Sequence, residues 1–161
     1  MCGRFNVISE PLTQFVISIL GDEGVYKKFL HEKTPDISLQ SHFNVAPTEQ
    51  VAVLRHGSHW SLSLMRWWLV PHWAPEPSSR YSMFNAKAET LQTSPAFRDS
   101  FKARRCIVPI SGYFEWRTEG GVKTPFYIEA DVDQGLALAG LWDRWQKGDR
   151  VIESCTIVTT T

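Results

Sequence analysis

Residues 105–116, RCIVPISGYFEW, decide the fold class that this sequence predicts. The first half is a short apolar run, and the second half is an aromatic run that follows a Ser-Gly break. Short runs of β-branched and aromatic residues bounded by turn formers are typical of β-strands rather than helices. The stretch therefore predicts two consecutive strands, over 105–110 and 113–116.

Similar runs recur on both sides of this pair. Turns containing Gly, Pro, Asn or Asp separate most of them, including those around 119–121 and 147–149. Residues 71–79 contain three prolines and are expected to form a loop. The further strands predicted in this way lie over 50–55, 61–70, 125–130, 136–142 and 154–159.

A helical pattern precedes the strands. Ser9 is expected to cap a helix that has Pro11 in its first turn, carries apolar residues at helical spacing as far as Leu20 and ends at Gly21. A second, shorter helical piece is expected over 24–31. Because the sequence contains no internal repeat or low-complexity tract, these elements predict a single β-rich α+β domain over 1–161.

The composition excludes several classes of protein. With 43% hydrophobic and 21% charged residues, the chain is neither disordered nor fibrous. No apolar run approaches the roughly 20 residues that span a bilayer, and no secretion signal is present, so we expect a cytoplasmic protein without a membrane partner. The three cysteines predict no disulfide framework and fit no zinc spacing, so Cys106 and Cys155 are interpreted as small buried residues and no metal is expected.

The charge is unevenly distributed. The formal net charge of zero argues against a protein that coats nucleic acid through bulk charge. Residues 55–105, however, carry a net charge of +5 against −5 for the remainder, and they hold four of the seven tryptophans. Cations interleaved with flat aromatic rings suit a groove for single-stranded nucleic acid, although a solvated basic face above a Trp-rich core explains the same composition.

Cys2 has an unusual chemistry if the initiator Met is removed, as is normal before a residue this small. The residue then carries an α-amine and a thiol on adjacent carbons, with reference pKa values of about 8 and about 8.5. A 1,2-aminothiol condenses with an aldehyde to a Schiff base that closes to a thiazolidine. The same thiol could instead be the nucleophile of an N-terminal hydrolase, and the position alone does not separate either role from an ordinary cysteine.

Two other constellations could take part in chemistry. Glu115 stands among three aromatic residues; facing inward it could serve as a general acid, whereas simple strand alternation would turn it to water. Asn85 and Lys87 share one face if their segment is extended, so that an amide could orient a nucleophile or a sugar hydroxyl while a cation holds a phosphate. The start of a helix with ordinary surface groups explains this second pair equally well.

Five motifs, taken in order, give the sequence a resemblance to the SRAP family (SOS response-associated peptidase-like proteins). Each motif alone is modest, but the ordered set runs from the first residue to the last predicted strand. The motifs are MCGRF at 1–5, FNVAP at 43–47, RW with LVP and W over 66–73, NAKAET at 85–90, and RRCIVP followed by GYFEW over 104–116.

The resemblance implies a function in the DNA-damage response: binding of single-stranded DNA and covalent capture of abasic sites, whose open form is an aldehyde. It implies that Cys2 forms a thiazolidine crosslink that shields the lesion, that Asn85 positions the reacting groups, and that Glu115 supplies acid–base help. It also implies a β-rich, barrel-like core of mostly antiparallel strands with flanking helices, and a monomer without cofactor or metal. The positions that it implies for DNA contact are Arg4, Asn44, Trp67, Lys87 and, as a wedge against the bases, Trp73.

The sequence departs from the family pattern at three points. Lys87 stands where Arg is frequent and keeps the charge but not the bidentate geometry, and Trp68 stands where Gly is usual. The family's His, in a His-x-Arg-Met-Pro-like segment after the strand resembling 154–159, has no counterpart before Thr161. We therefore expect that the sequence is truncated at its C-terminus and that turnover is slower without this His.

Two alternatives to covalent capture remain at this point. The first is an N-terminal-Cys hydrolase of the autoprotease or amidotransferase kind, which agrees with the peptidase in the family's name. The second is a non-covalent reader of single-stranded DNA that uses the Trp-rich basic segment alone.

Overall fold

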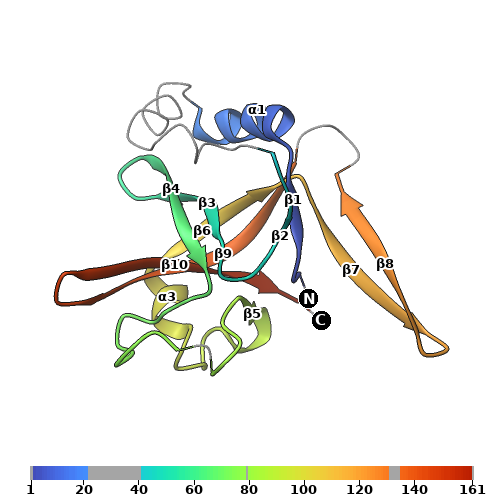
Figure 1. Ribbon diagram of the computed structural model, residues 1–161. Coiled ribbons are helices and arrows are strands. Elements are labelled where there is room, and N and C mark those ends of the chain that lie inside the picture. Colours follow the sequence, from blue (N-terminus) through green and yellow to red (C-terminus); the bar gives the residue numbers. More distant parts are fainter. Residues whose placement is uncertain (1, 22–40, 79, 131–134, 161) are drawn as a thin grey trace.

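A computed structural model describes residues 2–21, 41–78, 80–130 and 135–160 (Figure 1). Two α-helices lie in this part of the chain, α1 (Ser9–Leu20) and α3 (Arg98–Ala103), together with a short 3-10 helix, η2 (Ala88–Thr90). Neither α-helix is long and apolar enough to cross a membrane. The strands of the described residues are β1 (Phe5–Val7), β2 (His42–Val45), β3 (Gln50–His56), β4 (Trp60–Trp67), β5 (Asn85–Lys87), β6 (Arg105–Ile110), β7 (Gly112–Glu119), β8 (Val122–Glu129), β9 (Leu136–Lys147) and β10 (Arg150–Thr159).

Five of the strands form a closed ring. The order is β4-β3-β6-β9-β10, and β10 returns to β4 through parallel pairing of Ser154 with Arg66 and of Cys155 with Trp67. Beyond this contact the same edge of β10 pairs in parallel with β5. The other edge of β10 forms an antiparallel ladder with β9 from Arg150 to Ile157. The predicted barrel-like core of mostly antiparallel strands is therefore confirmed.

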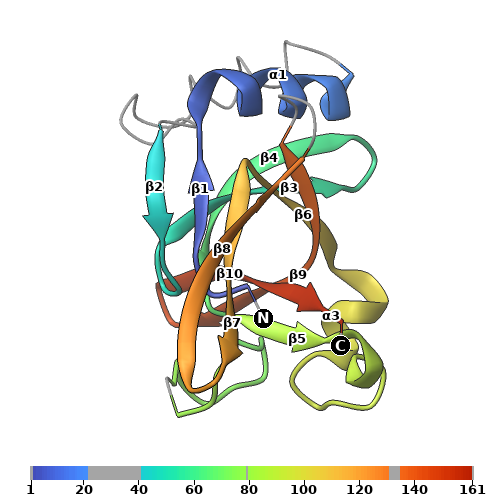
Figure 2. The same cartoon turned by 90° about the vertical axis from the view of Figure 1, so that its right-hand side faces the viewer.

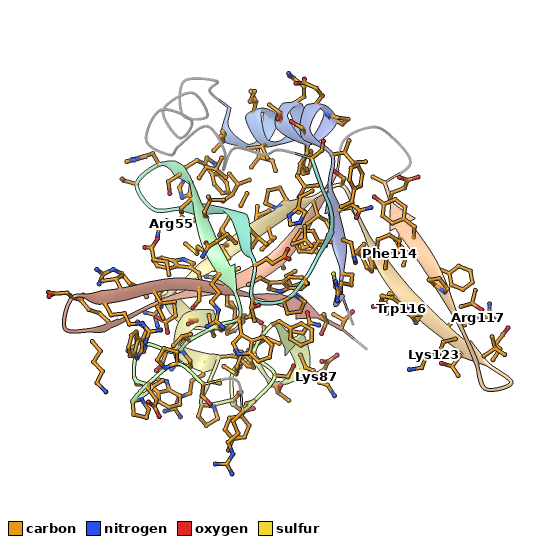
Figure 3. All side chains as sticks on the ribbon, in the orientation of Figure 1. Arg55, Lys87, Phe114, Trp116, Arg117 and Lys123 are labelled. Carbon is orange, nitrogen blue, oxygen red and sulfur yellow. The ribbon has the colours of Figure 1, made fainter. Side chains whose placement is uncertain are left out.

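A second sheet, in the order β2-β1-β7-β8, lies against one end of this barrel. The chain passes from one sheet to the other at Ser111, whose hydroxyl accepts a hydrogen bond from the Ile8 amide at 2.7 Å. The second sheet contributes Phe5 and Val45 to the barrel core around Trp67. Its β7–β8 hairpin projects from the body, as the labels of Trp116 and Lys123 show in Figure 3.

The helices cover the outside of the barrel. α1 packs Leu12, Val16 and Leu20 against Leu54 and Leu62 of β3 and β4. Gly21 ends this helix with φ +67, a left-handed conformation that a residue without Cβ adopts at no steric cost. The N-terminal cap is Ile8 rather than the predicted Ser9, and no side chain caps the helix, because Ser9 already lies in its first turn.

Most of the predicted strands are present, with differences at their ends. Strand 61–70 is shorter than expected, because β4 ends at Trp67 and residues 68–70 continue as buried irregular chain. The 113–116 and 125–130 strands belong to the longer hairpin of β7 and β8. β1, β2, β5 and α3 were not predicted, and the expected helix over 24–31 lies outside the described residues.

A buried carboxylate fastens the loop after β4 to the barrel. Asp143 of β9, with 3% of its side chain exposed, accepts a hydrogen bond from the His72 backbone amide at 3.0 Å and lies 3.0 Å from the His72 ring Nδ1. Arg104 brings its Nε to within 3.1 Å of the same carboxylate. Two residues further along β9, the Trp145 indole donates to the carbonyl of Ala74 at 2.7 Å. These contacts determine where the intervening Trp73 lies.

Asp143→Ala is expected to lower the free energy of unfolding by about 2–4 kcal/mol, because it removes the acceptor of a buried amide and the partner of the Arg104 guanidinium. Urea denaturation followed by tryptophan fluorescence measures the change. Asp149→Ala, at an exposed acid in the β9–β10 turn, is the matched control and is expected to stay within about 0.5 kcal/mol of the parent. Equal stability of the two variants would contradict the role given to Asp143.

Candidate active site

Cys2 is held at the end of the barrel by the pairing of β1. Phe5 lies opposite Tyr113, and Asn6 lies opposite Gly112. The Phe114 amide donates to the Arg4 carbonyl at 2.9 Å, so the antiparallel register continues toward the start of the chain. Cys2 is only 5% exposed. The two ends of the described chain meet here beside β5, as both views show (Figures 1 and 2).

The Cys2 side chain borders a cavity of about 200 Å³. β7 contributes Tyr113 and Glu115 to its walls, and β9 contributes Leu138. The remaining wall is the end of β10 and the residue after it, residues 157–160. We call this cavity the Cys2 pocket.

Glu115 enters the Cys2 pocket because β7 alternates. Tyr113 and Glu115 share the face that lines the pocket, whereas Phe114 lies on the opposite face and packs on Tyr127 with ring centroids 5.0 Å apart. The sequence places Glu115 among three aromatic residues. In the structure these residues do not enclose its carboxylate, because Phe114 lies on the opposite face of β7. Glu115 is half-buried, and its neighbours in the pocket come from β9, β10 and the start of the chain.

Asn85 joins β5 to the start of the chain. Its Nδ2 donates a hydrogen bond to the carbonyl of Cys2 at 2.8 Å. Its Oδ1 is buried and has no hydrogen-bond partner among the described residues. β5 is extended, so the interpretation that Asn85 and Lys87 share one face is confirmed, and Lys87 is exposed next to the chain ends (Figure 3).

The thiol of Cys2 is strongly perturbed. Burial, followed by the negative charge of Glu115, raises its pKa from the ordinary 9.0 to about 11. Burial likewise raises the pKa of Cys106 to about 12 and that of Cys155 well above the usual range. All three cysteines are free and buried.

The residues expected to contact DNA divide into three groups. Arg4 and Asn44 lie together, since an Arg4 Nη1 approaches the Asn44 carbonyl at 3.5 Å, and Asn44 adopts a positive φ of 65°. Trp73 is 52% exposed on the loop that Asp143 holds. Trp67, in contrast, is fully buried.

The expectation that Trp67 contacts DNA is therefore wrong. Its ring packs on Phe5 with centroids 4.9 Å apart, and its indole N–H donates to the Phe84 carbonyl at 2.9 Å. A buried indole with a satisfied N–H is a core residue. Trp68 is half-buried beside Phe84 and has no positive φ, so a tryptophan fits where the family usually has glycine.

Sequence reasoning missed several residues of the site. Tyr113 could have been found, because it lies two positions before Glu115 on the same strand. The wall formed by Leu138 and residues 157–160 could not be recognised from the sequence, because apolar residues and threonines occur in most β-strands. None of the described histidines lines the Cys2 pocket, and the described residues contain no cluster of three potential metal ligands.

The fold and the site together define a class of protein: a closed β-barrel that buries a cysteine near the chain start between a carboxylate and an amide, beside a small pocket. The sequence matches the family described as SOS response associated peptidase (SRAP) over residues 1–161, and the chain belongs to this family. The resemblance noted from the motifs is thus confirmed.

Curated relatives and a solved structure agree with this assignment. The chain is 34% identical to the abasic site processing protein YoqW of Bacillus subtilis, and the match covers 99% of this chain and 68% of the relative. It is also 34% identical to the abasic site processing protein YoaM of the same organism, with 99% and 67% covered. A crystal structure of a protein from Bacteroides thetaiotaomicron is similar with a TM-score of 0.78 and 27% identity, covering 99% of this chain and 68% of that chain.

Alkylation of Cys2 by iodoacetamide is expected to be slow at pH 7 and to accelerate as the pH rises toward 11, because the thiolate is the reactive form. Glu115→Gln removes a negative charge that disfavours the thiolate, so it is expected to lower the pKa of Cys2 and speed alkylation at a given pH. Peptide mapping by mass spectrometry separates Cys2 from the other two thiols. Glu119→Gln, near the exposed hairpin tip, is the control, and an equal effect of both variants would contradict the assignment to Glu115.

Proposed function

We propose that this chain processes abasic sites in DNA by capturing the aldehyde of the opened sugar with Cys2. The observation that carries the proposal is that Cys2 and Glu115 line one small pocket while Asn85 is hydrogen-bonded to the Cys2 carbonyl. The relatives named as abasic site processing proteins, which match 99% of this chain, support the same reaction class. These two observations together support lesion-reactive chemistry at Cys2.

The capture is a condensation followed by a ring closure. The α-amine of Cys2, free once Met1 is removed, adds to the aldehyde carbon, and loss of one water leaves a Schiff base. The thiol sulfur then bonds to the imine carbon while the proton of the thiol ends on the nitrogen. The product is a thiazolidine, and the overall change is the loss of one water and no oxidation.

The residues around Cys2 divide this work. Asn85 holds the Cys2 carbonyl, which orients the amine and the thiol, and its unpaired Oδ1 can accept a hydrogen bond from the amine or from a sugar hydroxyl. Glu115 transfers protons during loss of water and ring closure. Burial and the charge of Glu115 favour the protonated thiol of Cys2, so a base beside the thiol assists ring closure.

The raised pKa also argues against the alternative of an N-terminal-Cys hydrolase. Such an enzyme needs a thiolate to attack a carbonyl, whereas burial and the charge of Glu115 favour the protonated thiol of Cys2. Aldehyde capture does not have this requirement, because the amine attacks first. We therefore favour capture over peptide or amide hydrolysis.

Single-stranded DNA is the proposed substrate because the protein offers both cationic groups and an exposed aromatic ring. Arg4 and Lys87 supply two positive charges and Asn44 a polar group for the backbone, and the exposed indole of Trp73 supplies a surface on which bases stack. Lys87 binds phosphate as a point charge rather than through a bidentate fork. A base pair would hide the faces on which this stacking depends.

Incubation with a uracil-excised single-stranded oligonucleotide is expected to yield an adduct with the mass of protein plus oligonucleotide less one water. Intact-mass analysis measures it, after the N-terminus has been verified as Cys2. Cys2→Ala is expected to abolish the stable adduct and Cys106→Ala, a buried thiol elsewhere in the barrel, to leave it intact. An unchanged adduct in Cys2→Ala, or none in the parent, contradicts the proposal.

Trp73→Ala is expected to weaken binding to an undamaged single-stranded oligonucleotide by about 1–3 kcal/mol, through loss of base stacking. Lys87→Gln is expected to weaken it more evenly across sequences and to reduce the salt slope by about one. Fluorescence anisotropy at several salt concentrations measures both. Lys123→Gln on the β7–β8 hairpin is the control. If it changed the affinity and the salt slope as much as Lys87→Gln, DNA binding would depend only on the total charge of the protein.

A further inference from the structure

A second and larger hollow lies away from the Cys2 pocket. It has a volume of about 710 Å³ and opens where β4 and the β9–β10 hairpin diverge beyond their contact at Ser154 and Arg66. Three arginines line it, Arg66, Arg144 and Arg150, together with the polar side chains of Gln50 and Ser78. We call it the arginine hollow.

The arginine hollow carries a surplus of positive charge. Its one acidic residue, Glu153, lies 3.4 Å from Arg55 of β3 and is thus already paired from outside the hollow. None of the three lining arginines forms an ion pair with a residue of the described chain. Arg66 and Arg150 lie on the same face of the sheet, because Arg66 is opposite Ser154 and Ser154 is four residues after Arg150 on β10. Their unpaired guanidinium groups attract an anion, and their planar forks suit phosphate oxygens.

Two of these arginines are held in place by neighbouring side chains. Arg144 donates to the Oε1 of Gln146 at 2.7 Å. Arg150 lies with its guanidinium carbon 5.7 Å from the centre of the Trp145 ring, whose indole is itself bonded to the loop at Ala74. Preorganisation of this kind reduces the entropy lost when a phosphate binds.

The loop that carries Trp73 leads from the proposed DNA path into the arginine hollow. Pro77 and Ser78, at the end of this loop, form part of the wall of the hollow. The Ser78 carbonyl accepts a hydrogen bond from the Trp68 indole at 3.3 Å, and the Pro75 carbonyl accepts one from Lys147 at 3.3 Å. A DNA strand that stacks on Trp73 and continues along this loop would be led toward Arg66 and Arg150.

We propose that the arginine hollow is a second DNA-contact site, which binds backbone phosphates of the strand beyond Trp73. The proposal rests on the proposed function, since it needs DNA to pass Trp73. It adds a property that the Cys2 pocket does not require: affinity should depend on the length of the strand. A short strand occupies the Cys2 pocket alone, whereas a long strand occupies both sites.

The test compares two double variants that remove the same charge. Arg66→Gln with Arg150→Gln alters the hollow, and Lys102→Gln with Lys123→Gln alters exposed lysines on α3 and on the β7–β8 hairpin. In Figure 3, Lys123 lies on the opposite side of the molecule from Arg55, the partner of Glu153. Thermal melting of all proteins verifies that each variant is folded before binding is measured.

For an undamaged strand of about 30 nucleotides, the hollow variant is expected to bind roughly tenfold more weakly than the parent, with a salt slope lower by about two. For a strand of about six nucleotides, close to the site size of a small single-strand binding fold, its affinity and its abasic adduct yield should equal those of the parent. The lysine variant should match the parent with both strands.

An equal loss in both double variants, or no loss in the hollow variant, overturns the proposal. A second outcome also overturns it: the parent binds inorganic phosphate, and the hollow variant loses phosphate binding but keeps the parent's affinity for the long strand. The hollow would then be a site for a small free anion. Failure of the parent to form an adduct with the short abasic strand contradicts the Cys2 chemistry instead. The dependence of binding affinity on the length of undamaged DNA does not involve adduct formation, so failure of one proposal can be distinguished from failure of the other.

Discussion

The structure depends on the simultaneous pairing of both edges of β10. One edge runs antiparallel to β9, and the other meets β4 and then β5 in parallel. Buried backbone amides and carbonyls must all find partners, so β10 is stable only where both ladders form. This double pairing closes the barrel around the Trp67 core and holds β5 at its edge. Asn85 of β5 is thereby brought to the carbonyl of Cys2.

The Cys2 pocket consequently belongs to no single stretch of the chain. Its walls come from the first residues, from β7, from β9 and from the end of β10, which are separated by most of the sequence. Contacts of such long range form late and together, because each requires the others to close the loops between them. Chemistry at Cys2 is therefore coupled to the integrity of the whole barrel, whereas the tips of the β7–β8 and β9–β10 hairpins project away from it (Figure 1).

Apolar periodicity and turn residues predicted the long strands, α1 and a β-rich α+β domain, because these signals are strong over long segments. The barrel-like core was implied by the resemblance to the SRAP family. β1, β2 and β5 have three or four residues each, too few to show a period, and they are strands only because a neighbour pairs with them. Trp67 was misassigned because its orientation follows from the register of β4 in the closed ring, which composition does not reveal. Asp143 did carry a signal, a charged residue within an apolar strand, since such a residue needs buried partners. Cys2, Asn85 and Glu115 were proposed as a group from the family motifs; their meeting at one pocket depends on pairings between distant segments.

The burial of Cys2 has a consequence for the lifetime of the protein. Peroxides and other oxidants attack the thiolate, and the first step toward sulfenic and then irreversible sulfinic acid follows thiolate character and exposure. The Cys2 thiol is 5% exposed and has a pKa of about 11, so it has little thiolate character and little contact with solvent. In the proposed capture each Cys2 is used once, so its thiol has to stay reduced until DNA binds. The burial of Cys2 at the end of the barrel limits its oxidation before that step.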